Sequence, residues 1–154
     1  MKVTADSYRT AAVNHIGSSQ DLVEAKQYPL AAYVAGLSVE CMLRAYSQHV
    51  SATFDARHDL RVWYQRSRFD AIVPTSRALE VGSSITVVAT HWSNSQRYYS
   101  VELLRAEWKN AELDRGIRGD LVKELTRRLV DAAWEIVTLG EEQWVNSLRK
   151  SKSY

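Results

Sequence analysis

His58 and Arg97 are two residues whose side chains together could carry out acid–base chemistry on a phosphate ester. In-line cleavage of RNA needs a base that takes the proton of a 2′-hydroxyl and a cation that stabilises the charge developing on the phosphate. An imidazole can supply the base and a guanidinium the cation. The two residues are far apart in the 154-residue chain, so the fold has to bring them together. The alternative for His58 is a helix-start residue hydrogen-bonded to a loop.

Glu40 is an acidic residue inside an otherwise apolar helical segment. A carboxylate in such surroundings must be paired, or its burial costs considerable desolvation energy. Arg44, one helical turn later, is a ready partner, and Arg97 is a second candidate. We therefore expect Glu40 to be buried and paired with Arg44 or Arg97. The pair is either a structural ion pair or a device by which Glu40 orients Arg97 in a groove.

Two stretches of the chain are locally basic, and each is either a solvated helix face or a surface that contacts phosphates. The first comprises Arg57, Arg61, Arg66 and Arg68, and the second comprises Arg115, Arg118, Lys123, Arg127 and Arg128. Several aromatic residues can either stack on nucleobases or belong to the core. These are Trp92, Tyr98, Tyr99 and Trp108.

The composition excludes several classes of protein. The net charge of +2 is nearly balanced and does not by itself demand a nucleic-acid partner. The single cysteine, Cys41, excludes an internal disulfide and a cysteine-rich zinc site, and its apolar surroundings predict a buried structural thiol. We find no P-loop, no paired metal-ligand motif and no Ser-His-Asp grouping, so we expect neither a metal nor a cofactor.

The chain has no stretch of about 20 apolar residues and no signal-peptide pattern at its N-terminus, so we expect a cytoplasmic protein without a membrane partner. Its 6 glycines and 2 prolines are too few for a sandwich or barrel and favour long helices. Asp55 is positioned to cap the third helix, and the β-branched run 85–90 is assigned to helix because no partner strand is visible. Residues 93–96 read as a polar loop. The helical spacing predicts helices over 4–24, 29–49, 56–68, 76–91, 101–113 and from 119 to 140 or 144.

Three segments resemble the HEPN family. Residues 31–45 (AAYVAGLSVECMLRA) are similar to its signature helix, in which small residues are followed by a Glu, an apolar pair, a basic residue and Ala. His58-Asp59-Leu60 is similar to the family's His-Asp-Leu, and residues 92–98 (WSNSQRY) to a Trp-then-Arg-Tyr segment. The resemblance implies an all-α, HEPN-like helical bundle of four to six helices, often dimeric. We expect one domain, 1–148, followed by a disordered tail, 149–154.

HEPN proteins include metal-independent RNases of toxin–antitoxin and phage-defence systems, and non-catalytic partners of nucleotidyltransferases. The RNase members carry an Arg-x(4–6)-His motif near the start of the last long helix. Here no histidine follows His91, so that helix cannot supply the catalytic imidazole. Two pairs elsewhere match the spacing, but about as many matches are expected by chance. They are Arg9 with His15 and Arg44 with His49.

We therefore expect a HEPN-like component of a bacterial toxin–antitoxin, defence or mobile-element system that binds RNA or nucleotide without the standard catalysis. The alternatives are a metal-independent RNase with a site around His58 and Arg97, and a protein-binding partner of a nucleotidyltransferase. We expect a homodimer, because two apolar stripes on the last helix call for more cover than one bundle contact gives. The expected ligand-binding residues are Glu40, Arg44, Asp59 and Tyr98.

Overall fold

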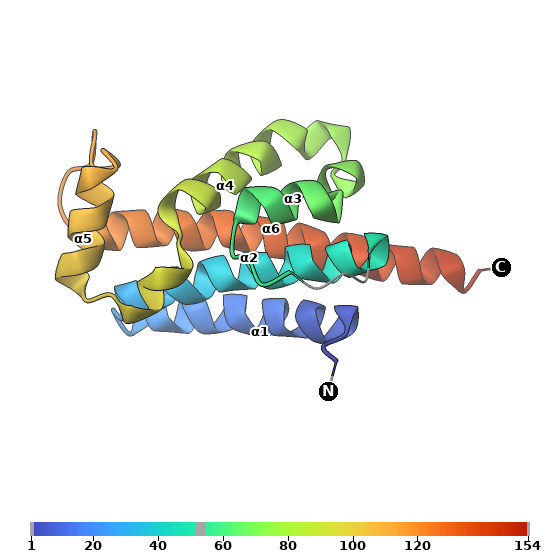
Figure 1. Ribbon diagram of the computed structural model, residues 1–154. Helices are drawn as coiled ribbons and strands as arrows, with labels where there is room; N and C mark the ends of the chain where they lie inside the picture. Colours follow the sequence, from blue (N-terminus) through green and yellow to red (C-terminus); the bar gives the residue numbers. More distant parts are fainter. Residues whose placement is uncertain (1, 52–54, 154) are drawn as a thin grey trace.

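The computed structural model describes residues 2–51 and 55–153. Within these residues the chain is all-helical, with six α-helices, three short 3-10 helices and no strand. The predicted all-α class is therefore confirmed (Figure 1). The elements are α1 Ala5–Glu24, α2 Tyr28–Val50, α3 Leu60–Ser67, η1 Phe69–Ile72, η2 Thr75–Arg77, α4 Ala78–His91, η3 Asn94–Tyr98, α5 Val101–Asn110 and α6 Leu121–Ser151.

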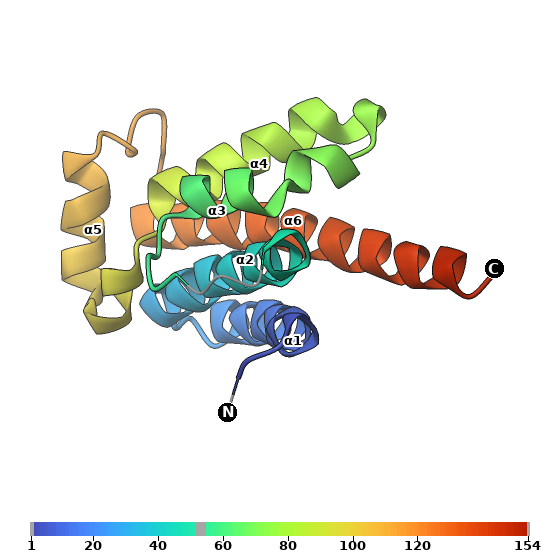
Figure 2. The same cartoon turned by 45° about the vertical axis from the view of Figure 1, so that its right-hand side comes forward.

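The long helices α1, α2 and α6 lie side by side and form the body of the molecule (Figures 1 and 2). On the side away from α1, α3 packs on α2 and α4 packs on α6. The short helix α5 crosses one end of the bundle, and at the other end the C-terminal turns of α6 extend past the neighbouring helices (Figure 2). Helix α3 and the residues just before it therefore lie against α2.

Helix α2 is the central element, as its nearly all-apolar sequence predicts, and most of its residues from Ala31 to Ala45 are buried. Its small residues allow close approach. A Cβ built on Gly36 would lie only 2.0 Å from Cδ1 of Trp92, and the indole Nε1 of Trp92 donates to the carbonyl of Tyr33 at 2.9 Å. The close neighbour at Gly36 is thus the side chain of Trp92, the residue that follows α4.

The third helix begins later than the sequence predicts. Asp59, and not Asp55, is its N-cap, because Oδ1 of Asp59 accepts from the backbone N–H groups of Arg61 (2.9 Å) and Val62 (3.2 Å). This is the usual way in which an aspartate satisfies the free donors of a helix start. Asp55 lies in the segment that precedes the helix, so its predicted role as the cap is wrong.

Other boundaries differ in smaller ways. The β-branched run 85–90 is helical within α4, as assigned from the sequence. The expected polar loop 93–96 lies largely within the 3-10 helix η3. Helix α6 continues through Arg149 and Lys150 to Ser151, so these residues are helical where the sequence predicts a disordered tail. The last tail residue, Tyr154, lies outside the described residues.

The two apolar stripes of α6 are covered mostly within the chain. Leu125, Leu129, Ile136 and Val137 are almost completely buried, and α1, α2 and α4 all pack on this helix. Trp134 remains 44% exposed. The stripes therefore give no strong argument for a partner chain, and the expected homodimer rests on the HEPN resemblance.

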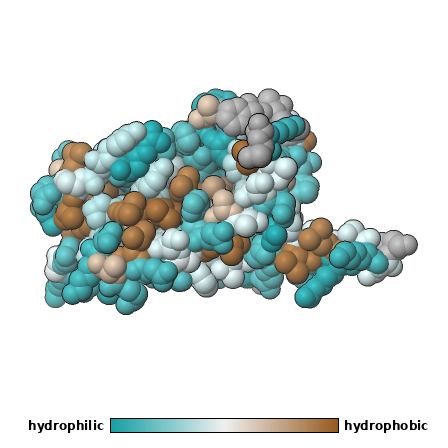
Figure 3. All heavy atoms as spheres, turned by 90° about the horizontal axis from the view of Figure 1, so that it is seen from below, coloured by the Kyte–Doolittle hydropathy of each residue, from teal (hydrophilic) through white to brown (hydrophobic). Residues whose placement is uncertain are grey.

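The extended end of α6 carries hydrophobic side chains into solvent, as the view from below shows (Figure 3). Leu148 on these turns is 51% exposed. Among the described residues, no helix combines the length and the apolar character that a membrane span requires.

Candidate functional site

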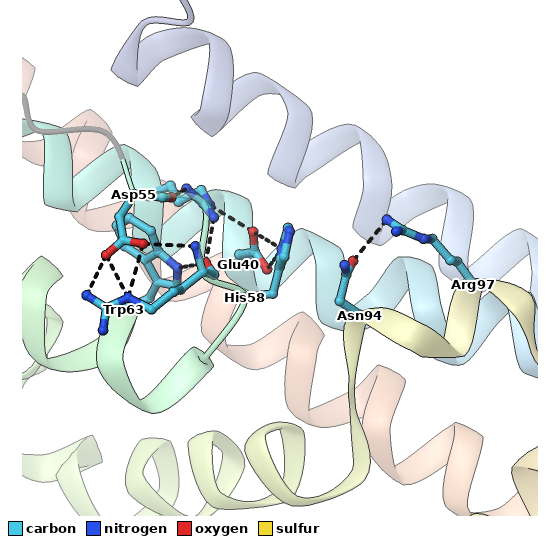
Figure 4. Close-up of polar contacts among 8 residues, drawn as sticks. Glu40, Asp55, His58, Trp63, Asn94 and Arg97 are labelled. Atoms are coloured by element: carbon cyan, nitrogen blue, oxygen red, sulfur yellow. Dashed lines mark hydrogen bonds and ion pairs between the residues drawn. The ribbon is translucent and has the colours of Figure 1, made fainter.

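Glu40 belongs to α2, and its buried side chain points toward the segment that leads into α3 (Figure 4). Its carboxylate accepts from Nε of Arg44 at 2.8 Å and lies 2.9 and 3.0 Å from Nδ1 of His58. With only 3% of the residue exposed, Glu40 is buried and paired with Arg44, as predicted. Its second partner is His58, where the sequence offered Arg97.

Arg44 ties α2 to the chain before α3. Besides its bond to Glu40, Nη1 donates to the carbonyl of Asp55 (2.7 Å) and Nη2 to the carbonyl of Arg57 (2.8 Å). The guanidinium lies 4.1 Å from the ring centroid of Trp63, whose indole also donates to the Arg57 carbonyl at 2.7 Å. Because all three guanidinium nitrogens already donate to the protein, this geometry favours a structural role for Arg44 over the predicted ligand-binding role.

The side chain of Asp55 also helps to hold the segment that leads into α3. Its carboxylate accepts from the guanidinium of Arg57 at 2.7 and 2.9 Å and from that of Arg66, and it also accepts from the backbone N–H of Arg57. The hydrogen bonds from Arg57 hold the pKa of Asp55 well below its ordinary value. Two arginines of the segment 57–68, Arg57 and Arg66, thus form ion pairs with one acid, Asp55.

The hydrogen bond to Glu40 determines which nitrogen of His58 carries the proton. A carboxylate oxygen only accepts, so Nδ1 must be the donor, and in a neutral ring Nε2 is then the free acceptor. Among the described residues Nε2 has no hydrogen-bond partner, and 41% of the side chain is exposed. A buried acid thus fixes the orientation of an imidazole whose other nitrogen is available to a ligand.

The imidazole borders a groove of about 590 Å³ between the start of α3 and the end of α4, which we call the His58 groove. It is lined by Arg57, His58, Asp59, Leu60, Arg61, Ala89, Thr90, Trp92, Ser93 and Asn94. A smaller pocket of about 290 Å³ also borders His58 and reaches Glu40, Cys41 and Tyr8. His58 therefore borders both cavities, and Glu40 borders the smaller one.

The His58 groove is lined by two cations, Arg57 and Arg61, and by one carboxylate, that of Asp59. Arg61 is exposed and its guanidinium has no partner among the described residues. Arg57 is neutralised in part by Asp55, and the carboxylate of Asp59 is used as the helix cap. The predicted ligand-binding residue Asp59 does line this groove, but its hydrogen bonds are those of a structural cap.

Arg97 and Tyr98 lie beside the His58 groove, and neither lines it. Nη1 of Arg97 donates to Oδ1 of Asn94 at 3.5 Å, and the guanidinium lies 4.8 Å from the ring centroid of Tyr98. Interaction with Tyr98, and then with Tyr33, raises the pKa of Arg97. In Figure 4, Asn94 stands between His58 and Arg97. The structure therefore brings His58 together with Glu40, and Asn94 separates His58 from Arg97.

Sequence reasoning missed the far wall of the groove. Thr90, Ser93 and Asn94 belong to the end of α4 and the following turn, far from His58 in the chain. A cluster of small polar residues after His91 was the available signal, and it is typical of any loop. Sequence reasoning also missed the contact between the Arg44 guanidinium and the Trp63 ring. A cation–π contact between separate elements produces no regular spacing in the sequence.

The remaining reactive groups offer little chemistry. Cys41 is buried, as predicted, and burial raises the pKa of its thiol to about 12, so it stays protonated and unreactive at neutral pH. In residues 2–51 and 55–153, no three His, Cys, Asp or Glu side chains gather in a way that could hold a metal ion.

Comparison of the chain with protein-family models, with curated proteins and with solved structures gave no match.

Proposed function

We propose that this chain is a HEPN-like component of a bacterial toxin–antitoxin, defence or mobile-element system, and that it binds RNA or nucleotide at the His58 groove. The all-helical fold is compatible with this class. The resemblance of residues 31–45, 58–60 and 92–98 to HEPN segments supplies the biological setting. The side chains that line the His58 groove support the position of the binding site.

The observation that carries the proposal is that two groups line the same groove. One is the oriented imidazole of His58, and the other is the guanidinium of Arg61. His58 is held by Glu40 through Nδ1, and Arg61 lines the same groove without a carboxylate partner among the described residues. Phosphate oxygens are strong acceptors and bind best to charged donors such as a guanidinium. A groove that offers the guanidinium of Arg61 and the polar side chains of Ser93 and Asn94 suits a phosphate of RNA or of a nucleotide. His58 adds a donor, Nε2–H, when its ring is protonated.

Binding can be measured by fluorescence anisotropy with labelled RNA at several salt concentrations. R61Q should weaken binding and reduce the slope of log affinity against log salt by about one unit, because one phosphate contact is lost. R149Q is the matched control, because Arg149 is an exposed arginine on the extended end of α6. Equal losses for the two variants would mean that binding is a general charge effect and would contradict the proposal.

A second candidate function is metal-independent RNA cleavage, and the Glu40–His58 pair is the observation that favours it. A carboxylate that fixes the tautomer leaves Nε2 of His58 free to act as a base. Since Arg97 does not line the groove, the cation in this candidate is Arg61. Cleavage of RNA in the presence of a chelator, lost in H58N, would favour this candidate. Binding without cleavage would favour the first.

The proposal has three further parts, which follow from the resemblance and from the sequence: a homodimer, a nucleotidyltransferase partner and a cytoplasmic location. Light scattering at micromolar protein concentration tests the first, since a monomeric mass would contradict it. Co-purification with a nucleotidyltransferase encoded beside the gene tests the second. Cell fractionation tests the third.

A further inference from the structure

Four aromatic residues were candidates for stacking on nucleobases, and the structure separates them. Trp92 and Trp108 are buried, with 6% and 1% exposed, and both indoles donate to backbone carbonyls. Tyr99 is partly buried, and its hydroxyl donates to Glu107 at 3.1 Å. Tyr98, by contrast, is 76% exposed. It alone among these four presents a ring face to a ligand.

The position of Tyr98 is well anchored despite its exposure. It ends the 3-10 helix η3, and Gln96 in that helix is only 2% exposed. The side-chain amide of Gln96 donates to the carbonyl of His91 (2.7 Å) and to Glu107 (3.1 Å), which ties η3 to the end of α4 and to α5. A ring held on a fixed turn loses little conformational entropy when a ligand stacks on it.

Tyr98 is also linked to the His58 groove through two contacts. The guanidinium of Arg97 packs on its ring, and the same guanidinium bonds to Asn94, which lines the groove. The order His58, Asn94, Arg97 is visible in Figure 4. A cation on one side of the ring strengthens stacking and adds positive charge for a nucleic-acid backbone.

We propose that Tyr98 is a stacking platform for a nucleobase and that the ligand of the His58 groove is single-stranded RNA. One phosphate lies in the groove at His58 and Arg61, and a neighbouring base stacks on Tyr98. In a duplex the base faces are covered by their neighbours, so a duplex cannot use this platform. The inference rests on the proposed function, because it needs the groove to bind a phosphate.

The test uses the full chain and fluorescence anisotropy with labelled oligouridine of about eight nucleotides, within the range of known single-strand sites, and with an RNA duplex of similar length. We expect Y98A to weaken binding of the single strand about tenfold, the size of effect seen when a stacking aromatic is lost. Y98F should bind as the unchanged protein does, because stacking needs the ring and not the hydroxyl. W134A is the matched control, because Trp134 is an exposed aromatic on α6, 44% exposed.

Single-strand binding that is the same in Y98A and in the unchanged protein would overturn the inference. An equal loss of single-strand and duplex binding would also overturn it, because a stacking platform acts on unpaired bases. R61Q separates the two proposals. If R61Q weakens binding while Y98A does not, the groove binds phosphate and only the platform fails. If neither variant weakens binding, both proposals fail.

Discussion

Nδ1 of His58 lies 2.9 and 3.0 Å from the two carboxylate oxygens of Glu40, a residue that belongs to the most buried helix of the fold. The same carboxylate is paired with Arg44 at 2.8 Å. One buried acid therefore has two functions in the fold. It neutralises the arginine that anchors the segment before α3, and it orients the imidazole that borders the groove. The first function predicts effects on stability, and the second predicts effects on binding.

Replacing Glu40 should destabilise the fold strongly. E40A leaves the guanidinium of Arg44 buried without its carboxylate, and breaking a buried ion pair in this way costs about 3 kcal/mol or more. The free energy of unfolding from urea titration measures the loss. E142A is the control, because Glu142 is 58% exposed and lies 3.8 Å from Arg77, so its removal should cost less than about 0.5 kcal/mol. A similarly small loss for E40A would mean that Glu40 is solvated.

Arg44 should not tolerate replacement by lysine. R44K keeps the positive charge next to Glu40 but loses the planar fork that reaches the carbonyls of Asp55 and Arg57 and stacks on Trp63. We expect a loss of about 2 kcal/mol, the scale of one or two charged hydrogen bonds. Unfolding in urea measures the loss, and R105K on α5 is the control. If R44K unfolded like the unchanged protein, charge and not geometry would be the contribution of Arg44.

Gly36 and Gly17 should respond to alanine in opposite directions. At Gly36 the added Cβ would lie 2.0 Å from Trp92 Cδ1, so the indole must move and its bond to Tyr33 is lost, at a cost of about 2 kcal/mol. At Gly17, in the middle of α1, an added Cβ meets no atom within 4 Å. G17A should therefore stabilise the protein by about 0.5 kcal/mol through helix propensity. Thermal unfolding of both variants checks the signs, and stabilisation by G36A would contradict the close packing of Trp92 on Gly36.

The contribution of Asp55 should depend on pH in a defined direction. Its pKa in the folded protein is lowered from the ordinary value of 3.8, mainly by the hydrogen bonds from Arg57. A lowered folded-state pKa means that the unfolded chain binds the proton more readily, so the stabilisation is complete above 3.8 and is lost as the pH falls below it. The difference in unfolding free energy between the unchanged protein and D55N should shrink between about pH 6 and about pH 3. A difference that stays constant over this range would show that the carboxylate of Asp55 is not held by the two arginines.

Much of the helical fold follows from local sequence. The spacing of apolar residues places all six α-helices, because a helix must bury one continuous face and that requirement leaves a period in the sequence. Pro29 lies in the first turn of α2, where its missing N–H costs nothing, and the pairing of Glu40 with Arg44 follows from their separation by one turn.

The start of α3 shows where local reasoning fails. Asp55 and Asp59 are both suitable caps by residue type. Asp59 is the one used, because the carbonyls of Asp55 and Arg57 accept from Arg44 and Trp63 and not from backbone N–H groups of a helix. The residue that decides the boundary, Arg44, belongs to another helix, so nothing in the local sequence could reveal it.

The sequence by itself determined the helical class, the central position of α2 and the need of Glu40 for a cationic partner, since each depends on residues within a few turns of one another. Only the tertiary structure decided the site. It placed His58 on Glu40, brought Thr90, Ser93 and Asn94 to the same groove as His58, and left the ring of Tyr98 exposed. The physical reason is that these arrangements involve residues from separate elements of the chain, so they depend on how the elements pack.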